Sequence, residues 1–147
     1  MFTPIVAGLL FISGIGGVVV DERAYTIYLI RHYAAKYGVS TDDALAVSWC
    51  ESRFNNVPSV NDWEDSYGPF QLGSEWWKER AHEHGRVEDP RMRKSIEANI
   101  ELALHSASVS GWGRWTCKPD STTVISQKKE LRLFLRMTGE RHISYAK

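Results

Sequence analysis

The stretch from Ile96 to Ala107 carries the clearest helical pattern in this 147-residue chain. Its apolar and small positions recur every three or four residues along one stripe, made up of Ile96, Asn99, Ile100, Ala103, Leu104 and Ala107. Small alanines between larger side chains let a neighbouring helix approach closely. The pattern therefore predicts a central core helix in a mainly helical fold.

Further helices are expected on both sides of this segment. Residues 23–37 show a helical pattern, and Ser40 is placed as the N-cap of a second helix. Ser74 and Asp89 are expected to begin two more, the second of which is the core helix itself. A final amphipathic helix leads to a polar end, 136–147, that is expected to fray.

The overall composition is that of one globular domain, which we place at residues 21–147. Hydrophobic residues make up 43% of the chain and charged residues 24%. Because 18 basic residues balance 18 acidic ones, no net charge attracts nucleic acid, and no nucleic-acid partner is expected. The six tryptophans and six tyrosines either fill the core or line a saccharide or peptide groove.

Residues 1–20 form a separate, apolar segment. They contain no charged side chain and are long enough to cross a bilayer as a helix. A secretory signal normally begins with a basic region, which this sequence lacks, so a membrane anchor is preferred to a cleaved signal. The alternative is an apolar arm packed on a partner protein. We therefore expect an N-terminal apolar helix that contacts a membrane or another protein.

Cys50 and Cys117 are the only cysteines, and they lie far apart in the sequence. A disulfide between them would stabilise the fold by about 4 kcal/mol in the chain-entropy model. Two buried free thiols are equally consistent with the sequence. No cluster of cysteine and histidine has metal-ligand spacing, so neither a metal nor another cofactor is expected.

Glu51 is the candidate functional carboxylate. Val47 and Ser48 precede it at helical spacing, so the glutamate falls on a core-facing stripe near the end of its helix. The negative end of the helix dipole and the nearby rings of Trp49 and Phe54 would both raise its pKa. A solvated glutamate near a helix terminus is the simpler interpretation of this residue alone.

The segment after Glu51 is expected to leave the helix. Residues 55–66 contain two asparagines, a proline and several acids, which predict an irregular loop or a small hairpin. Gly68 and Pro69 then fix a tight turn and leave the amide of Gln71 free to form hydrogen bonds.

Three short motifs occur in order along the chain. The first is ESRFN at 51–55, which is similar to a catalytic E-S-x-F-N stretch, and the second is SYGPFQ at 66–71, which is similar to a G-[LIP]-[MF]-Q segment. The third is ANI at 98–100, similar to the N-I start of a long central helix, with an aromatic G-W-x-x-W segment after it. In this order they resemble the lysozyme-like superfamily, in its soluble lytic transglycosylase and goose-type lysozyme branch. The resemblance covers residues 25–134.

The resemblance implies a mostly helical, lysozyme-like fold with a short loop or small β-hairpin after the catalytic helix. It also implies cleavage of the β-1,4 bond between N-acetylmuramic acid and N-acetylglucosamine in the glycan strands of peptidoglycan. Glu51 would be the general acid, for which a raised pKa is required at neutral pH. The implied saccharide-binding residues are Ser66, Tyr67, Phe70, Gln71, Trp112 and Trp115. For Phe70 and the two tryptophans, core packing is an equal alternative.

The position that holds a second acid in the animal-type lysozymes of this superfamily is Ser66 here. Without a nucleophile or a base that directs water, attack by the sugar's own 6-hydroxyl can resolve an oxocarbenium-like transition state. The resemblance therefore favours a lytic transglycosylase over a hydrolytic muramidase. Asp62, Glu64 and Asp65 remain candidate second acids that position water, although solvated loop acids are the simpler interpretation of each.

Two other functional classes fit the same sequence. One is a lysozyme-like module that binds glycan or joins an assembly without cutting, and the other is a helix-rich, membrane-anchored partner protein. A wall-cutting domain with an apolar N-terminus suits a bacterial envelope enzyme that faces the periplasm from the inner membrane. It equally suits a phage virion protein that opens the wall while the genome is delivered, and the lack of a basic region favours the virion.

Overall fold

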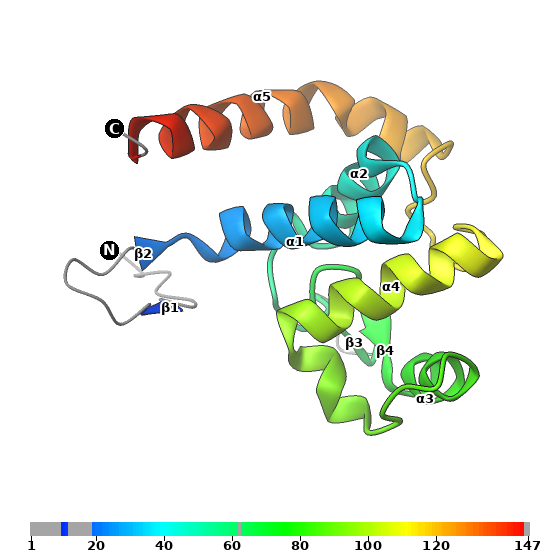
Figure 1. Ribbon diagram of the computed structural model, residues 1–147. Coiled ribbons are helices and arrows are strands. Elements are labelled where there is room, and N and C mark those ends of the chain that lie inside the picture. Colours follow the sequence, from blue (N-terminus) through cyan, green and yellow to red (C-terminus); the bar gives the residue numbers. More distant parts are fainter. Residues whose placement is uncertain (1–9, 12–18, 62, 146–147) are drawn as a thin grey trace.

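The computed structural model describes residues 10–11, 19–61 and 63–145 (Figure 1). These residues form five α-helices, one short 3-10 helix and two small two-stranded ladders. The expectation of a mainly helical fold is therefore confirmed for the part of the chain that is described.

Strands β1 (Leu10–Phe11) and β2 (Val19–Val20) pair antiparallel before the first helix. The expected apolar helix over residues 1–20 is not shown, because these four residues are extended and residues 1–9 and 12–18 lie outside the described part. Phe11, Val19 and Val20 are aromatic or β-branched, which favours the extended backbone of this ladder. Among the described residues, no helix combines the length and apolarity needed to cross a membrane.

Helices α1 (Glu22–Tyr37) and α2 (Thr41–Ser52) follow each other closely. Gly38 ends α1 in the left-handed conformation, with φ of 67°, which a glycine adopts without a Cβ clash. The hydroxyl of Ser40 accepts a hydrogen bond from the amide of Asp43 at 3.3 Å and caps α2 as predicted.

The small hairpin expected after α2 is confirmed. Strand β3 (Ser66–Tyr67) pairs antiparallel with β4 (Leu72–Gly73), and α3 (Ser74–Glu83) begins directly after it. The prediction that Ser74 is the N-cap was wrong, because Gly73 occupies that position. The amide and hydroxyl of Ser74 instead donate to the carboxylate of Asp65, which ties the start of α3 to the loop.

Asp89 begins a short 3-10 helix, η1 (Pro90–Lys94), and not the core helix that was predicted to start there. Helix α4 (Ile96–Ser110) starts later, at a second cap supplied by the hydroxyl of Ser95. The last helix, α5 (Thr122–Tyr145), continues well into the polar end that was expected to fray. Its Lys, Glu, Leu and Arg residues are good helix formers, and no proline interrupts them.

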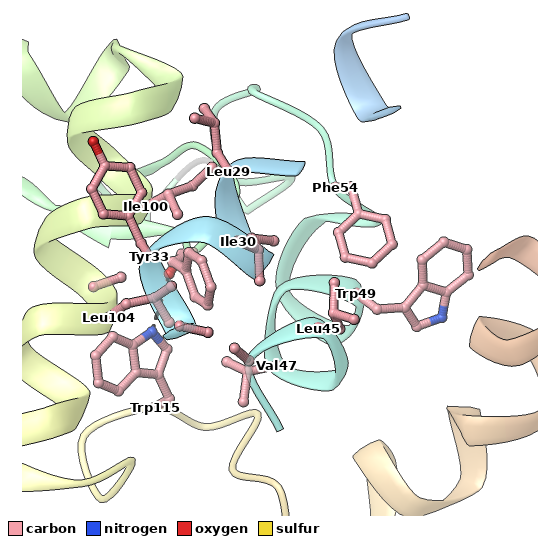
Figure 2. Close-up of a cluster of buried hydrophobic side chains, with 14 of the residues drawn as sticks. Leu29, Ile30, Tyr33, Leu45, Val47, Trp49, Phe54, Ile100, Leu104 and Trp115 are labelled. Atoms are coloured by element: carbon pink, nitrogen blue, oxygen red, sulfur yellow. Dashed lines mark hydrogen bonds between the residues drawn. The ribbon is translucent and has the colours of Figure 1, made fainter. Parts of the chain in front are cut away.

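The hydrophobic core lies between α1, α2 and α4 (Figure 2). Ile30 of α1, Val47 of α2 and Leu104 of α4 are each 0% exposed and converge there. Helix α4 contributes the predicted stripe, so the central core helix is confirmed.

Helix α5 is attached to α2 by an aromatic group. The ring of Trp49 packs 5.4 Å from that of Phe54 and 5.0 Å from that of Phe134 on α5. Figure 2 shows Trp49 and Trp115 on opposite sides of α2. Trp49 and Phe54 therefore dock α5, a role that their closeness to Glu51 in the sequence did not predict.

Candidate active site

Glu51 lies in the last turn of α2 and is half-buried beside the loop that joins α4 to α5. Its Oε1 accepts a hydrogen bond from the backbone N–H of Cys117 at 3.4 Å. Burial raises the pKa of Glu51 to about 7; the Cys117 amide opposes this shift and the negative charge of Glu64 adds to it. The side chain is therefore a carboxylic acid that exchanges a proton near neutral pH.

A disulfide holds the loop against this end of α2. The sulfurs of Cys50 and Cys117 are 2.05 Å apart, and their Cα atoms are 5.8 Å apart. Cys50 immediately precedes Glu51, and Cys117 supplies the amide that reaches the carboxylate. The crosslink therefore keeps a backbone donor at the candidate acid.

Two serines dock the hairpin turn on the same helix. The hydroxyls of Ser48 and Ser52 both donate to the carbonyl oxygen of Pro69, at 3.0 and 2.9 Å. Ser48 and Ser52 are one helical turn apart and lie on either side of Glu51 in the sequence. The turn is thus fixed to the segment of α2 that carries the acid.

A buried amide secures this turn from the side of α4. Asn99 is 0% exposed, accepts a hydrogen bond from the amide of Phe70 at 3.1 Å, and donates to the carbonyls of Tyr67 and Arg93, both at 2.8 Å. A Cβ at Gly68 would lie 2.4 Å from the Asn99 side-chain nitrogen, so the turn needs a glycine there. Sequence reasoning missed this role; its signal was a polar residue on an apolar stripe.

Two of the predicted groove residues belong to the core. Phe70 is 0% exposed and Trp115 is 7% exposed, and the indole N–H of Trp115 donates to the carbonyl of Phe70 at 3.2 Å. The expectation that Phe70 and Trp115 line a saccharide groove is corrected on this point, because packing already covers their rings. Trp112 is half-buried and stacks on Phe70 with 6.1 Å between ring centroids, so part of its indole remains accessible.

The other predicted groove residues, Ser66, Tyr67 and Gln71, are partly exposed on the hairpin. The side-chain nitrogen of Gln71 donates to the carbonyls of Val57 and Gly68, at 2.9 and 3.0 Å. Gln71 therefore ties the turn to the preceding loop through its donors and keeps its side-chain oxygen as an acceptor.

The candidate second acids have different surroundings. Asp62 lies outside the described residues. Asp65 pairs with Arg93 at 2.6 Å and accepts from Ser74, and hydrogen bonding to Ser74 is the largest of the effects that lower its pKa. Glu64 is the carboxylate whose charge acts on Glu51, so Asp65 serves structure and Glu64 is the acid coupled to the site.

Hydrogen bonds hold Glu64 in place on its loop. Its two oxygens accept from the hydroxyl of Ser59 at 3.0 Å and from the side-chain amide of Asn61 at 3.3 Å. Both donors are uncharged, and the ion pairs found among the described residues do not include Glu64.

An open hollow of about 380 Å³ lies at the loop that joins α4 to α5, and we call it the 112–120 hollow. Its lining residues are Trp112, Gly113, Lys118, Pro119 and Asp120. Sequence reasoning found Trp112 and missed Lys118 and Asp120, because surface charges in a loop carry no signal of their own. In the part of the chain that is described, no cluster of three or more His, Cys, Asp or Glu side chains could hold a metal.

Comparisons with known proteins find no relative for this chain. A scan against protein-family models gives no match, and searches of curated proteins and of solved structures give no significant match.

Proposed function

We propose that this chain is a peptidoglycan-cleaving lytic transglycosylase of lysozyme-like type, with Glu51 as its general acid. The observation that carries the proposal is a half-buried carboxyl group whose pKa is raised to about 7, at the end of a helix and beside a docked hairpin. An acid with such a pKa is half protonated at neutral pH and can give its proton to a leaving oxygen.

The reaction needs only this group and the substrate. Protonated Glu51 gives its proton to the glycosidic oxygen between N-acetylmuramic acid and N-acetylglucosamine while the C1–O bond breaks. The 6-hydroxyl of the muramic residue then bonds to C1 and returns its proton to the Glu51 carboxylate. The products are a 1,6-anhydromuramic end and a free N-acetylglucosamine end, and no water is consumed.

Exposed groups of the hairpin and of the loop after α4 supply saccharide contacts in this proposal. Tyr67, Gln71 and Ser66 present a ring, an amide oxygen and a hydroxyl on the hairpin, and Trp112 presents part of its indole on that loop. Phe70 and Trp115 support this surface from within the core.

A hydrolytic muramidase is the second candidate, and it is favoured by the position of Glu64. The charge of this carboxylate reaches Glu51, as expected for a base that directs water at C1. Hydrolysis adds one water to the cleaved end, so the masses of the products separate the two reactions. Glu64→Gln would abolish hydrolysis, whereas anhydro products would still form at a pH below the pKa of Glu51.

Zymography on purified peptidoglycan tests the catalytic proposal, with Glu51→Gln beside the parent chain. Clearing by the parent and not by Glu51→Gln is expected, because a positioned general acid contributes about 10²–10⁴-fold in rate. Equal clearing by both would refute the role of Glu51. Clearing by neither, with glycan binding retained, would favour a non-catalytic glycan-binding module.

The site of action remains part of the proposal. A wall-cutting domain that follows an apolar segment suits a bacterial envelope or a phage virion, where residues 1–20 would contact a membrane or a partner protein. Washed particles that contain the chain would place it in the virion, and particles that lack it would favour the envelope.

A further inference from the structure

The 112–120 hollow carries one charge of each sign on its wall. Lys118 and Asp120 are both exposed and stand on either side of Pro119. The ion pairs found among the described side chains involve neither of them, so the two charges do not neutralise each other. A ligand in this hollow meets an ammonium and a carboxylate together.

The lining of the hollow includes the residue that directly follows a contact of the candidate acid. Lys118 directly follows Cys117, whose amide donates to Glu51 and whose sulfur is bonded to Cys50. The disulfide therefore fixes one end of the hollow against α2. Lys118, on the wall of the hollow, is therefore one residue from the backbone amide that contacts Glu51.

The aromatic wall of the hollow is held in advance of binding. The indole of Trp112 packs on Phe70 with 6.1 Å between centroids and meets Trp115 edge-on at 5.1 Å. Since Phe70 and Trp115 are buried, Trp112 is backed by the core, and little side-chain freedom is lost when a ligand contacts it.

Gly113 lines the hollow and has open space beside its Cα. A Cβ built on this glycine meets no atom within 4 Å, and its backbone is not in the left-handed region. A larger side chain can therefore be added at this lining position without straining the turn.

We propose that the 112–120 hollow binds the stem peptide of peptidoglycan, with Lys118 pairing with a stem carboxylate and Asp120 with the free amino group of its diamino acid. This rests on the proposed function, since the stem is attached to the muramic residue that Glu51 would act on. N-acetylated glycan carries no positive charge, whereas the stem carries both signs and short apolar side chains. The cation and the anion of the hollow match the charges of the peptide rather than the sugar chain, and the indole of Trp112 adds an apolar contact that suits either.

The test compares cleavage of two substrates by Lys118→Glu and the parent chain. One substrate is peptidoglycan strands that bear stems, and the other is the same strands after an amidase has removed the stems, which leaves the lactyl carboxylate in place. Lys118→Glu should lower kcat/KM on stem-bearing strands by about tenfold. This loss is larger than that expected from removing one exposed ion pair, because the new carboxylate also repels the stem carboxylate. On strands without stems it should match the parent.

Three further variants separate effects of the hollow from general effects of charge and folding. Gly113→Phe adds a bulky ring to the lining of the hollow and should lower kcat/KM on stem-bearing strands, whereas Gly113→Ala should retain it. Lys129→Glu reverses an exposed charge on α5 and should change neither substrate.

The outcomes distinguish this inference from the proposed function. An equal loss on both substrates would mean that Lys118 meets the lactyl carboxylate or the sugar, and would overturn stem recognition. No loss on either would overturn it as well. If the parent and Glu51→Gln are equally inactive on both substrates, the proposed function falls and the stem proposal falls with it.

Discussion

The backbone amide of Cys117 donates to the Glu51 carboxylate at 3.4 Å, across 66 residues of sequence. This bond stabilises the ionised form, while burial of the same group favours the protonated form. Burial has the larger effect, so the pKa of Glu51 stays near 7 rather than near its ordinary value of 4.5. The disulfide between Cys50 and Cys117 holds this balance in place.

The titration of Glu51 sets an upper pH limit on activity. Because only the protonated form can act as the acid, kcat should fall as pH rises through about 7, by about tenfold per pH unit beyond it. Glu64→Gln removes a negative charge that raises this pKa, so the falling limb should move to lower pH. Rates on peptidoglycan fragments from pH 5 to 9 measure both. Glu88→Gln, an exposed acid of another loop, is the control, and an unmoved limb in Glu64→Gln would contradict the coupling.

The ionisation of Glu51 should also lower the free energy of unfolding as the pH rises to neutral and above. Its folded pKa lies above its unfolded value of 4.5, so its favourable contribution exists below pH 4.5 and is lost as pH rises through about 7. Glu51→Gln should therefore raise the free energy of unfolding at pH 8, by on the order of 3 kcal/mol, and change it little at pH 4. Urea unfolding at the two pH values checks this. An equal effect at both would show that ionisation is not the cause.

Loss of the disulfide should affect both stability and the acid. Cys50 and Cys117 are 67 residues apart, and opening a loop of that size should cost about 4 kcal/mol. Freeing the Cys117 amide removes an effect that lowers the Glu51 pKa, so the falling limb of the pH profile should move to higher pH. Mass measurements with and without reductant establish the bond, and urea unfolding of Cys50→Ser with Cys117→Ser gives its contribution. Two free thiols in the untreated protein would contradict the structure.

Replacement by alanine should lower the free energy of unfolding far more at Gly68 than at Gly38. Both have positive φ, at 86° and 67°, so alanine costs about 1 kcal/mol of backbone strain at each. At Gly68 the new Cβ would also displace Asn99, whose amide satisfies three buried backbone groups, at a cost of about 2–4 kcal/mol more. Thermal and urea unfolding of the two alanine variants compare them directly. Equal losses would mean that the Asn99 bonds add nothing.

A pair of histidines should make the fold sensitive to acid. The rings of His84 and His105 are 4.2 Å apart; burial is the largest effect lowering the pKa of each, and the positive charge of Arg86 acts in the same direction. The unfolded chain therefore binds more protons, so this stability is present above pH 6.5 and is lost as pH falls below it.

The experiment on these histidines requires the Glu51→Gln background. Glu51 titrates over a similar pH range, and its ionisation changes the free energy of unfolding in the opposite direction. The free energy of unfolding should fall between pH 7 and pH 5 and fall less when both histidines are replaced by glutamine. His82→Gln, an exposed histidine paired with Glu88, serves as the control. A fall of the same size in the double variant would exclude the pair as the source.

Local patterns predicted several elements because their causes are local. Ser40 caps its helix wherever the helix packs, since its hydroxyl acts on backbone three residues away. The same reasoning placed Ser74 wrongly, because its hydroxyl donates to Asp65, nine residues earlier on the preceding loop, and Gly73 takes the cap position. The start of α4 was also predicted at Asp89, where the Asp-Pro pair begins the 3-10 helix η1 instead.

The features of the fold and the candidate site also separate into those with local causes and those that depend on tertiary packing. The sequence alone predicted the mainly helical fold, the hairpin after α2 and the choice of Glu51. These predictions depend on periodicity and turn residues, which are patterns of neighbouring positions. Only the tertiary structure turned Phe70 and Trp115 into core, bound Asp65 to Arg93, and brought Lys118 and Glu64 to the neighbourhood of the acid. Burial and charge coupling depend on residues far apart in the chain, and it is the packing of α2 against the hairpin and the crosslinked loop that determines them.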